Sequence, residues 1–166
     1  MDMIIRPAEE GDYPEILKLN KADEEMLSPL DEDTLHRMSK MTALFQVAET
    51  EGRIAAFQMI YREGCEYWSD NYKWFCAHYP RFLYVDRIVV GREYRKYGIG
   101  RRLYDEVFAY AEKTDVPLIT AEVDIAPEYN AASMAFHERM GFREVGTKPY
   151  GKVTVSLQVW ENHIGK

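Results

Sequence analysis

A nine-residue run, FLYVDRIVV at Phe82–Val90, constrains the fold of this chain more than any other segment. It is apolar on both faces except at Asp86 and Arg87, which is typical of a central strand that is covered on two sides. A glycine-containing loop follows, then a segment at 101–113 whose apolar residues recur at helical spacing, then a second buried strand, LITAEVDIA, at 118–126. This order of strand, helix and strand predicts a right-handed crossover between two parallel neighbours.

The rest of the chain alternates between helix and strand patterns. The expected elements are a strand at 3–6, helices at 13–20, from 31 or 33 to about 40, and at 131–140, a hairpin of strands at 44–49 and 54–61, and closing strands around Val145 and at 154–160. Asn130 suits the N-cap of the last helix, and Gly141 suits its C-cap. At 166 residues the chain fits one domain. We therefore expect a mixed α/β (α+β) fold in a single domain, 1–166, with a central mixed sheet of about six to seven strands flanked by helices.

Residues 62–81 form an aromatic-rich insertion that fits no simple period. Two interpretations stay open: a surface excursion whose aromatic side chains pack back on the core, or a wall of the pocket for a substrate. On the second interpretation, the residues that line the pocket are Tyr67, Trp68, Tyr72 and Trp74.

Charge and composition exclude several classes of partner. The net charge of −7 makes general nucleic-acid binding a poor expectation, although a local basic patch can still hold a small anion. The N-terminus lacks the pattern of a signal peptide and no run of about 18 apolar residues occurs, so we expect a cytoplasmic protein without membrane association. Cys65 and Cys76 are expected to be reduced thiols, and no metal site is expected. A homodimer is kept open as the commonest oligomer.

The loop RKYGIGRRL, at 95–103, places four basic residues where the helix begins, against the partial positive charge of a helix start. This placement indicates an anionic ligand. Gly98 and Gly100 allow a sharp turn and a close approach of the backbone to phosphate. The pattern GxxxxGK[ST] is absent, and Leu103 stands where the dinucleotide fingerprint has its third glycine, so neither of these nucleotide loops is present.

The pattern Arg-x-x-Gly-x-Gly, between FLYVDRIVV and a later helix that runs from Asn130 to the pair Gly141-Phe142, resembles the GCN5-related N-acetyltransferase (GNAT) superfamily. The match in order and spacing extends from Phe82 to Phe142. The resemblance implies acetyl-coenzyme A (acetyl-CoA) as cosubstrate and splayed parallel central strands that open a slot for its thioester. The residues that it implies in binding this cosubstrate are Ile88, Val89, Val90, Arg95, Lys96, Tyr97, Gly98, Ile99, Gly100, Arg101, Asn130 and Ser133.

The resemblance also implies direct attack of an amine on the thioester in a ternary complex, which needs a general base. Glu122, in Ala-Glu-Val, matches the glutamate that serves as base in members that acetylate the N-termini of ribosomal proteins. Asp86 is the second candidate, because the histone-acetylating members carry their base on the strand before the loop. It ranks below Glu122 because the glutamate of those members falls nearer Tyr84. The alternatives are that Asp86 pairs with Arg87 or Arg92 and that Glu122 is a solvated strand residue.

An acid must protonate the leaving thiolate. Many members place a tyrosine seven residues after the asparagine, and here that position holds His137, on the same helix face as Asn130. Three roles stay open for His137: it protonates the thiolate, it donates a hydrogen bond to the cosubstrate, or it only fills space. Tyr84, Tyr129 and Tyr150 are substitutes for the acid.

The leading hypothesis is an N-acetyltransferase that acts on a primary amine of a small molecule, because the aromatic insertion and the acidic net charge favour a cationic or amphipathic amine. Acetylation of a peptide N-terminus stays open. The rival class is a protein that binds acyl-CoA without turnover. A third alternative is a phosphate-binding regulatory domain specific for nucleotides.

Overall fold

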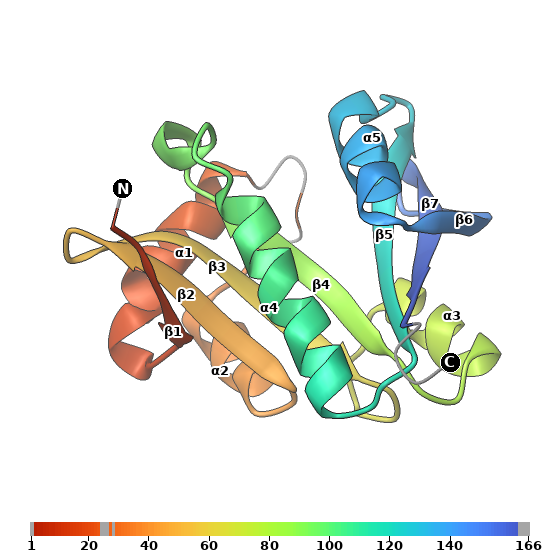
Figure 1. Ribbon diagram of the computed structural model, residues 1–166, viewed down its shortest axis with the longest axis horizontal. Helices are drawn as coiled ribbons and strands as arrows, with labels where there is room; N and C mark the ends of the chain where they lie inside the picture. The colour runs from red at the N-terminus through yellow and green to blue at the C-terminus, as the bar shows by residue number, and fades with distance from the viewer. Residues whose placement is uncertain (1, 24–26, 28, 163–166) are drawn as a thin grey trace. The chain divides into compact units, whose positions relative to one another are not determined.

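Seven strands in the order β1-β2-β3-β4-β5-β7-β6 make up the sheet of the computed structural model, which describes residues 2–23, 27 and 29–162 (Figure 1). The strands are β1 (Ile4–Pro7), β2 (Leu44–Thr50), β3 (Arg53–Arg62), β4 (Leu83–Val90), β5 (Leu118–Ala126), β6 (Arg143–Tyr150) and β7 (Val153–Glu161). The helices are η1 (Glu10–Asp12), α1 (Tyr13–Ala22), α2 (Glu32–Ser39), α3 (Asp70–His78), η2 (Arg92–Tyr94), α4 (Ile99–Lys113) and α5 (Ala131–Met140). The predicted fold class, a mixed sheet with flanking helices, is confirmed.

The chain divides into two compact units, Met1–Tyr61 with Asp86–Ala109 and Arg62–Val85 with Tyr110–Lys166. The division runs through β3, β4 and α4, so each unit contains part of these elements. No helix within the described residues is long and apolar enough for a membrane span.

In the first unit, β1, β2 and β3 pair antiparallel, and the hairpin of β2 and β3 was expected. The start of α4 packs on β2 and β3 through a small apolar cluster in which Ala48, Ala55, Ala56, Ile99 and Leu103 are buried. A buried glutamine fastens this contact, since Gln58 Nε2 on β3 donates to the carbonyl of Leu103 at 3.2 Å. The N-terminal part of α4 is therefore fixed on the sheet.

In the second unit, β7 pairs antiparallel with both β5 and β6. The start of β4 pairs in parallel with β5, at Leu83↔Ile119 and Tyr84↔Thr120, which confirms the predicted parallel neighbours. Helix α5 has the predicted ends: the Asn130 side chain accepts from Ser133 N, and Gly141 closes the helix at a φ of 99°.

The sequence did not predict α3, which lies inside the aromatic insertion. Ser69 caps it by accepting from Tyr72 N at 3.5 Å. Tyr72 and Phe75 are buried on several sides by aromatic rings, among them Tyr84, whose ring centroid lies 5.4 Å from that of Tyr72. Because aromatic residues occur on more than one face of the helix, no single stripe marks it in the sequence.

Candidate active site

Two glycines at the start of α4, in the first unit, border open space: Gly98 just before the helix and Gly100 in its first turn. Gly98 has a φ of +71°, in the left-handed region that favours glycine. A Cβ added at Gly98 or at Gly100 would meet no atom within 4 Å. A ligand can therefore approach the backbone here without meeting a side chain.

The start of α4 presents backbone donors beside these glycines. The first-turn N–H groups of a helix have no acceptor within the helix, and the helix bonds of α4 begin with Arg102 N donating to the carbonyl of Gly98 at 3.2 Å. No acidic residue lies in the first turn of α4. Ile99 and Leu103 are buried and hold this turn in place. These features fit a diphosphate group.

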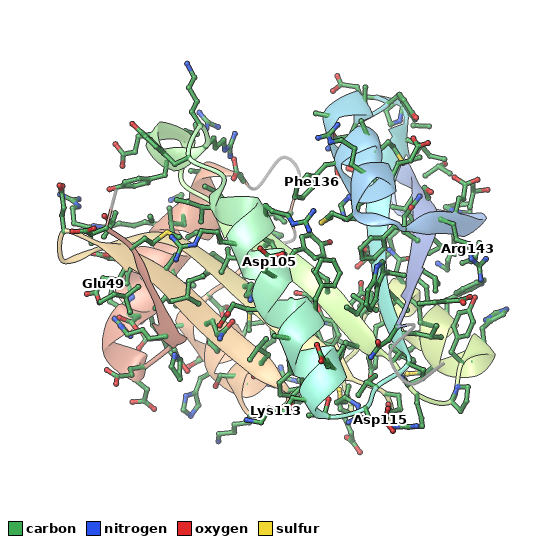
Figure 2. The ribbon with its side chains drawn as sticks, viewed as in Figure 1. Glu49, Asp105, Lys113, Asp115, Phe136 and Arg143 are labelled. Carbon is green, nitrogen blue, oxygen red and sulfur yellow. The ribbon has the colours of Figure 1, made fainter. Side chains whose placement is uncertain are left out.

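Two basic residues of the loop, Arg95 and Arg101, already have partners in the same unit. Arg95 donates to Asp23 Oδ2 at 2.7 Å and to the carbonyl of Val90 at 3.1 Å. Arg101 pairs with Asp105, one turn along α4, at 3.1 Å. Figure 2 shows Asp105 on α4. Lys96 and Tyr97 are exposed.

The end of β4 holds side chains in the core of the first unit. Val89 is buried, and Ile88 and Val90 pack against the apolar cluster under α4. Packing of these three side chains fixes the backbone that leads into the loop.

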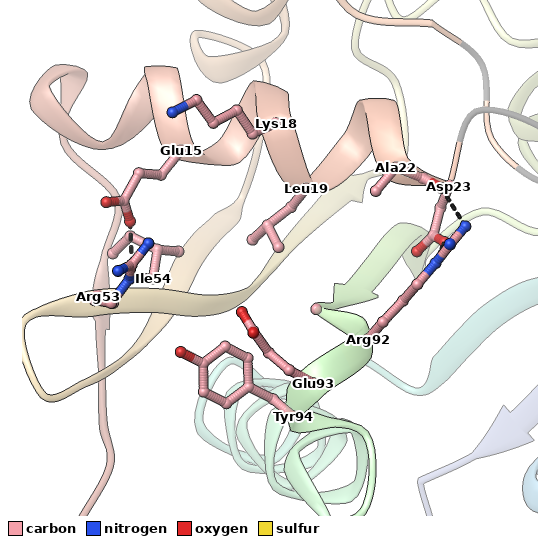
Figure 3. Close-up of a pocket in the computed structure, with 11 residues that line it drawn as sticks. Glu15, Lys18, Leu19, Ala22, Asp23, Arg53, Ile54, Arg92, Glu93 and Tyr94 are labelled. Atoms are coloured by element: carbon pink, nitrogen blue, oxygen red, sulfur yellow. Dashed lines mark hydrogen bonds and ion pairs between the residues drawn. The ribbon is translucent and has the colours of Figure 1, made fainter.

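A pocket of about 380 Å³ opens beside the turn after β4, in the first unit (Figure 3). It is lined from α1, from the start of β3 and from the residues around η2. Glu15 Oε2 accepts from Ile54 N at 2.8 Å, and Arg92 donates to the carbonyl of Ala22 at 2.8 Å. Its lining mixes acidic and basic side chains, and no motif in the sequence pointed to it.

In the second unit, two neutral donors hold the carboxylate of Glu122. Tyr84, on β4, donates its hydroxyl to Oε2 at 2.7 Å, and Asn71, on α3, donates its amide to Oε1 at 2.8 Å. Tyr84 and Asn71 are buried and Glu122 is half-buried. Each oxygen of the carboxylate therefore has a fixed orientation.

Asp86, in the first unit, is engaged by a cation. Its Oδ2 lies 2.7 Å from Nε of Arg87, and both side chains are buried. Arg87 also donates to Asn20 Oδ1 at 2.9 Å. The ion pair that we considered as the alternative for Asp86 is thus present.

His137 is buried on α5 in the second unit. Its Nδ1 donates to the carbonyl of Ser133 at 2.7 Å, and its ring meets that of Phe142 edge-on. Burial lowers the pKa of His137, while the bond to Ser133 opposes this shift. At neutral pH the ring is therefore an uncharged imidazole with its proton on Nδ1.

Helix α5 covers the face of β5 opposite to Glu122. Gln158 Nε2 on β7 contacts Met134 Sδ of α5 at 3.8 Å, and Gln158 pairs with Ala121. Glu122 pairs with Leu157, so its side chain points to the other face. His137 and Glu122 do not share a face of this part of the sheet.

A sequence model of the acetyltransferase (GNAT) family matches residues 8–142 of this chain. The chain belongs to this family. Among curated proteins, none matches its sequence significantly.

Several solved structures share the fold of this chain over nearly its whole length. Ard1 of Thermoplasma volcanium aligns with a TM-score of 0.78 at 13% identity, over 97% of this chain and 98% of that chain. The ribosomal-protein-alanine N-acetyltransferase of Brucella melitensis aligns with a TM-score of 0.70 at 24% identity, over 96% of this chain and 99% of that chain. The protein yncA of Salmonella typhimurium, solved with its cofactor acetyl-CoA, aligns with a TM-score of 0.73 at 16% identity, over 100% of this chain and 98% of that chain.

The other predicted acid and cosubstrate residues of this GNAT chain differ in exposure. Tyr129 and Tyr150 are 60% and 37% exposed. Asn130 Oδ1 accepts from Ser133 N at 3.1 Å, so the Asn130 side chain serves as a helix cap.

Burial raises the pKa of Asp124, on the same face of β5 as Glu122.

The four residues predicted to line the acceptor pocket fall into two groups. Tyr67 and Tyr72 are buried in the second unit, where their rings meet edge-on at 5.6 Å. Trp68 is 40% exposed. Trp74 stacks on His78, with the two ring centroids 3.7 Å apart. Their role toward an acceptor stays a prediction.

Sequence reasoning missed Asn71 as part of the candidate site. Asn71 and Glu122 are 51 residues apart, and Asn71 lies in the segment for which no helix was predicted. The local signal that could have placed Asn71 in the first turn of a helix is Ser69, a residue type that suits a helix N-cap.

Proposed function

We propose that this chain transfers the acetyl group of acetyl-CoA to a primary amine of a small molecule by direct attack in a ternary complex. The observation that carries the proposal is the carboxylate of Glu122, which Tyr84 and Asn71 hold by both oxygens. A fixed, half-buried carboxylate suits the removal of a proton from an attacking amine. Membership of the acetyltransferase family supports the reaction class.

The donor side of the proposal uses the loop at 95–101. Its backbone N–H groups bind the diphosphate of acetyl-CoA, with charge supplied by Arg95, Lys96 and Arg101. The backbone of 88–90 binds the pantetheine arm as an added strand does. Asn130 and Ser133, at the start of α5, are proposed as further contacts. The similar structure from Salmonella typhimurium, which contains acetyl-CoA, supports acetyl-CoA as the cosubstrate.

On the acceptor side, Glu122 accepts a proton from the amine, whose nitrogen forms a bond to the acetyl carbon. The carbon–sulfur bond breaks, and the thiolate takes a proton. His137 is retained as a candidate for the acid, although its Nδ1 proton is bonded to Ser133. Asp86 ranks below Glu122 as the base because its carboxylate is already paired with the Arg87 guanidinium.

Two classes of acceptor are compared. The acidic net charge and the aromatic side chains of 62–81 favour a small cationic amine. A peptide N-terminus is the second candidate, favoured by the Glu122 motif and by the similar fold of ribosomal-protein-alanine N-acetyltransferases. We place the small amine first because it rests on the aromatic residues and charge of this chain, whereas the peptide N-terminus rests on its similarity to other proteins.

Release of free thiol from acetyl-CoA tests the proposal. A panel of polyamines, aromatic amines and amino acids is compared with peptides that have a free N-terminus, for the wild type and for Glu122→Gln. Thiol release that depends on a small amine and falls at least about 100-fold in Glu122→Gln supports the proposal. Binding of acetyl-CoA without release for any amine would establish the rival class, a non-catalytic acyl-CoA-binding protein. Turnover with peptides alone would replace the small amine by a peptide N-terminus.

A further inference from the structure

The contact between α3 and Glu122 gives the aromatic insertion a role that a pocket wall does not explain. We propose that Asn71 is a positioning residue for the Glu122 carboxylate and that α3 is anchored so as to hold it. Asn71 Nδ2 donates to Glu122 Oε1 at 2.8 Å, and both residues lie in the second unit. The inference rests on the proposed function, in which Glu122 is the base.

Helix α3 is fastened on both sides of Asn71. Ser69 caps its start, two residues before Asn71. Tyr72, the next residue, donates its hydroxyl to the carbonyl of Arg62 at 2.6 Å and accepts from Cys65 N at 3.0 Å. Asn71 itself is fully buried. The amide therefore has little freedom to leave Glu122.

The orientation of the Asn71 amide follows from the carboxylate. An ionised carboxylate only accepts hydrogen bonds, so the NH₂ group must face Glu122. Asn71 Oδ1 is then buried, and it has no hydrogen-bond partner in the described part of the chain. A buried unpaired carbonyl destabilises a fold, and an apolar side chain of similar size avoids that penalty. The bond to Glu122 explains why an asparagine stands here.

The donors at Glu122 differ from the donor at Asp86. Tyr84 and Asn71 are neutral, so they orient the carboxylate while stabilising its charge less than a guanidinium does. Asp86 has the guanidinium of Arg87 at 2.7 Å. The Glu122 carboxylate is therefore oriented by neutral donors, whereas the Asp86 carboxylate is paired with a cation.

The neighbours of Glu122 determine what a titration reports. Tyr84 and Asp86 on β4 and Asp124, two residues along β5, are titratable groups on its face of these strands. On β7 the residue paired with Glu122 is Leu157, and Gly146 of β6 pairs with Leu157. Asn71 is the contact from α3. A change at Asn71 thus acts on Glu122 directly.

Two variants of Asn71 test the inference. Asn71→Leu removes the donor, and Asn71→Asp has the same shape but places a second carboxyl group against Glu122. We expect the acid limb of the pH profile of kcat/KM to move to higher pH in both, by about one pH unit or more in Asn71→Asp. The titration of the Glu122 carboxyl, followed by ¹³C NMR and assigned with Glu122→Gln, should move in the same direction.

Asn162→Asp is the matched control. Asn162 Nδ2 donates to the carbonyl of Val116 at 3.3 Å, in the same unit and away from Glu122 along the sheet. This variant should lower the melting temperature without moving the acid limb. If Asn71→Asp lowers the melting temperature but leaves the Glu122 titration in place, Asn71 is structural and the inference is wrong. If the titration moves but Glu122→Gln keeps full activity, the positioning stands and the proposed base is wrong.

Discussion

Tyr84 and Glu122 meet across the parallel pair of β4 and β5, with the phenolic hydroxyl 2.7 Å from Glu122 Oε2. The register accounts for the contact, because Tyr84 pairs with Thr120 and Glu122 lies two residues further along the same face of β5. The long side chain of tyrosine spans that offset. Tyr84, on the strand before the loop, thus donates to the carboxylate on the next strand.

The first prediction concerns this hydroxyl. Tyr84→Phe keeps the ring in its contacts with Tyr72 and Phe75 but removes the donor to Glu122. We expect kcat to fall about tenfold or more, since a hydrogen bond to a charged group is worth about 1.5–3 kcal/mol. Steady-state kinetics over pH 5–9 measures it, and the acid limb should move to higher pH as it does for Asn71→Leu. An unchanged kcat with an unchanged limb would show that Tyr84 has no part in the reaction.

The second prediction compares two glycines of positive φ. Gly98→Ala and Gly52→Ala both place a Cβ in open space, at φ values of +71° and +74°. Each should lower the unfolding free energy by about 1–2 kcal/mol, because a non-glycine residue is strained there. Only Gly98→Ala should weaken binding of coenzyme A, measured by calorimetry, by about tenfold or more. Equal affinities in the two variants would remove the loop from the proposed donor site.

The third prediction concerns the ion pair of Arg95 and Asp23. Asp23 Oδ2 lies 2.7 Å from the Arg95 guanidinium and competes for it with a bound diphosphate. Asp23→Asn should therefore tighten binding of coenzyme A by up to about fivefold, which corresponds to the worth of an exposed ion pair. Arg95→Ala should weaken it, and both effects should shrink as salt rises from 50 to 500 mM. Weaker binding in Asp23→Asn would mean that Asp23 orients Arg95 for the ligand.

The sequence predicts elements that have a local pattern, but it does not predict contacts between residues that are far apart in the chain. The strands at 83–90 and 118–126 and the helices α4 and α5 carry their own periodicity and caps, so they were predicted closely. The pairing of Asp86 with Arg87 was also considered, because the two are adjacent. The bond from Asn71 to Glu122 depends on how a capped helix packs on a sheet 51 residues away in sequence, and no local pattern encodes that distance.

The last prediction concerns the stability that His137 contributes. Burial lowers its pKa in the folded chain, whereas in the unfolded chain the imidazole titrates near its ordinary value of about 6.5. Below that value the unfolded state takes up a proton that the folded state resists, so the contribution of His137 is fully present above about pH 6.5 and is lost as the pH falls toward the folded pKa. Asp124, whose pKa burial raises, acts in the opposite sense and loses its contribution as the pH rises.

The difference between wild type and His137→Gln isolates this group, since the other titrating residues are common to both. Urea unfolding at pH 7.5, 6.5, 5.5 and 5.0 should show wild type losing stability faster than His137→Gln below pH 6.5. Parallel pH dependences would mean that His137 has the same pKa in the folded and unfolded states, which its burial argues against. A neutral His137 at pH 7 with its proton on Nδ1 would direct the search for the acid that protonates the thiolate to Tyr84, Tyr129 and Tyr150.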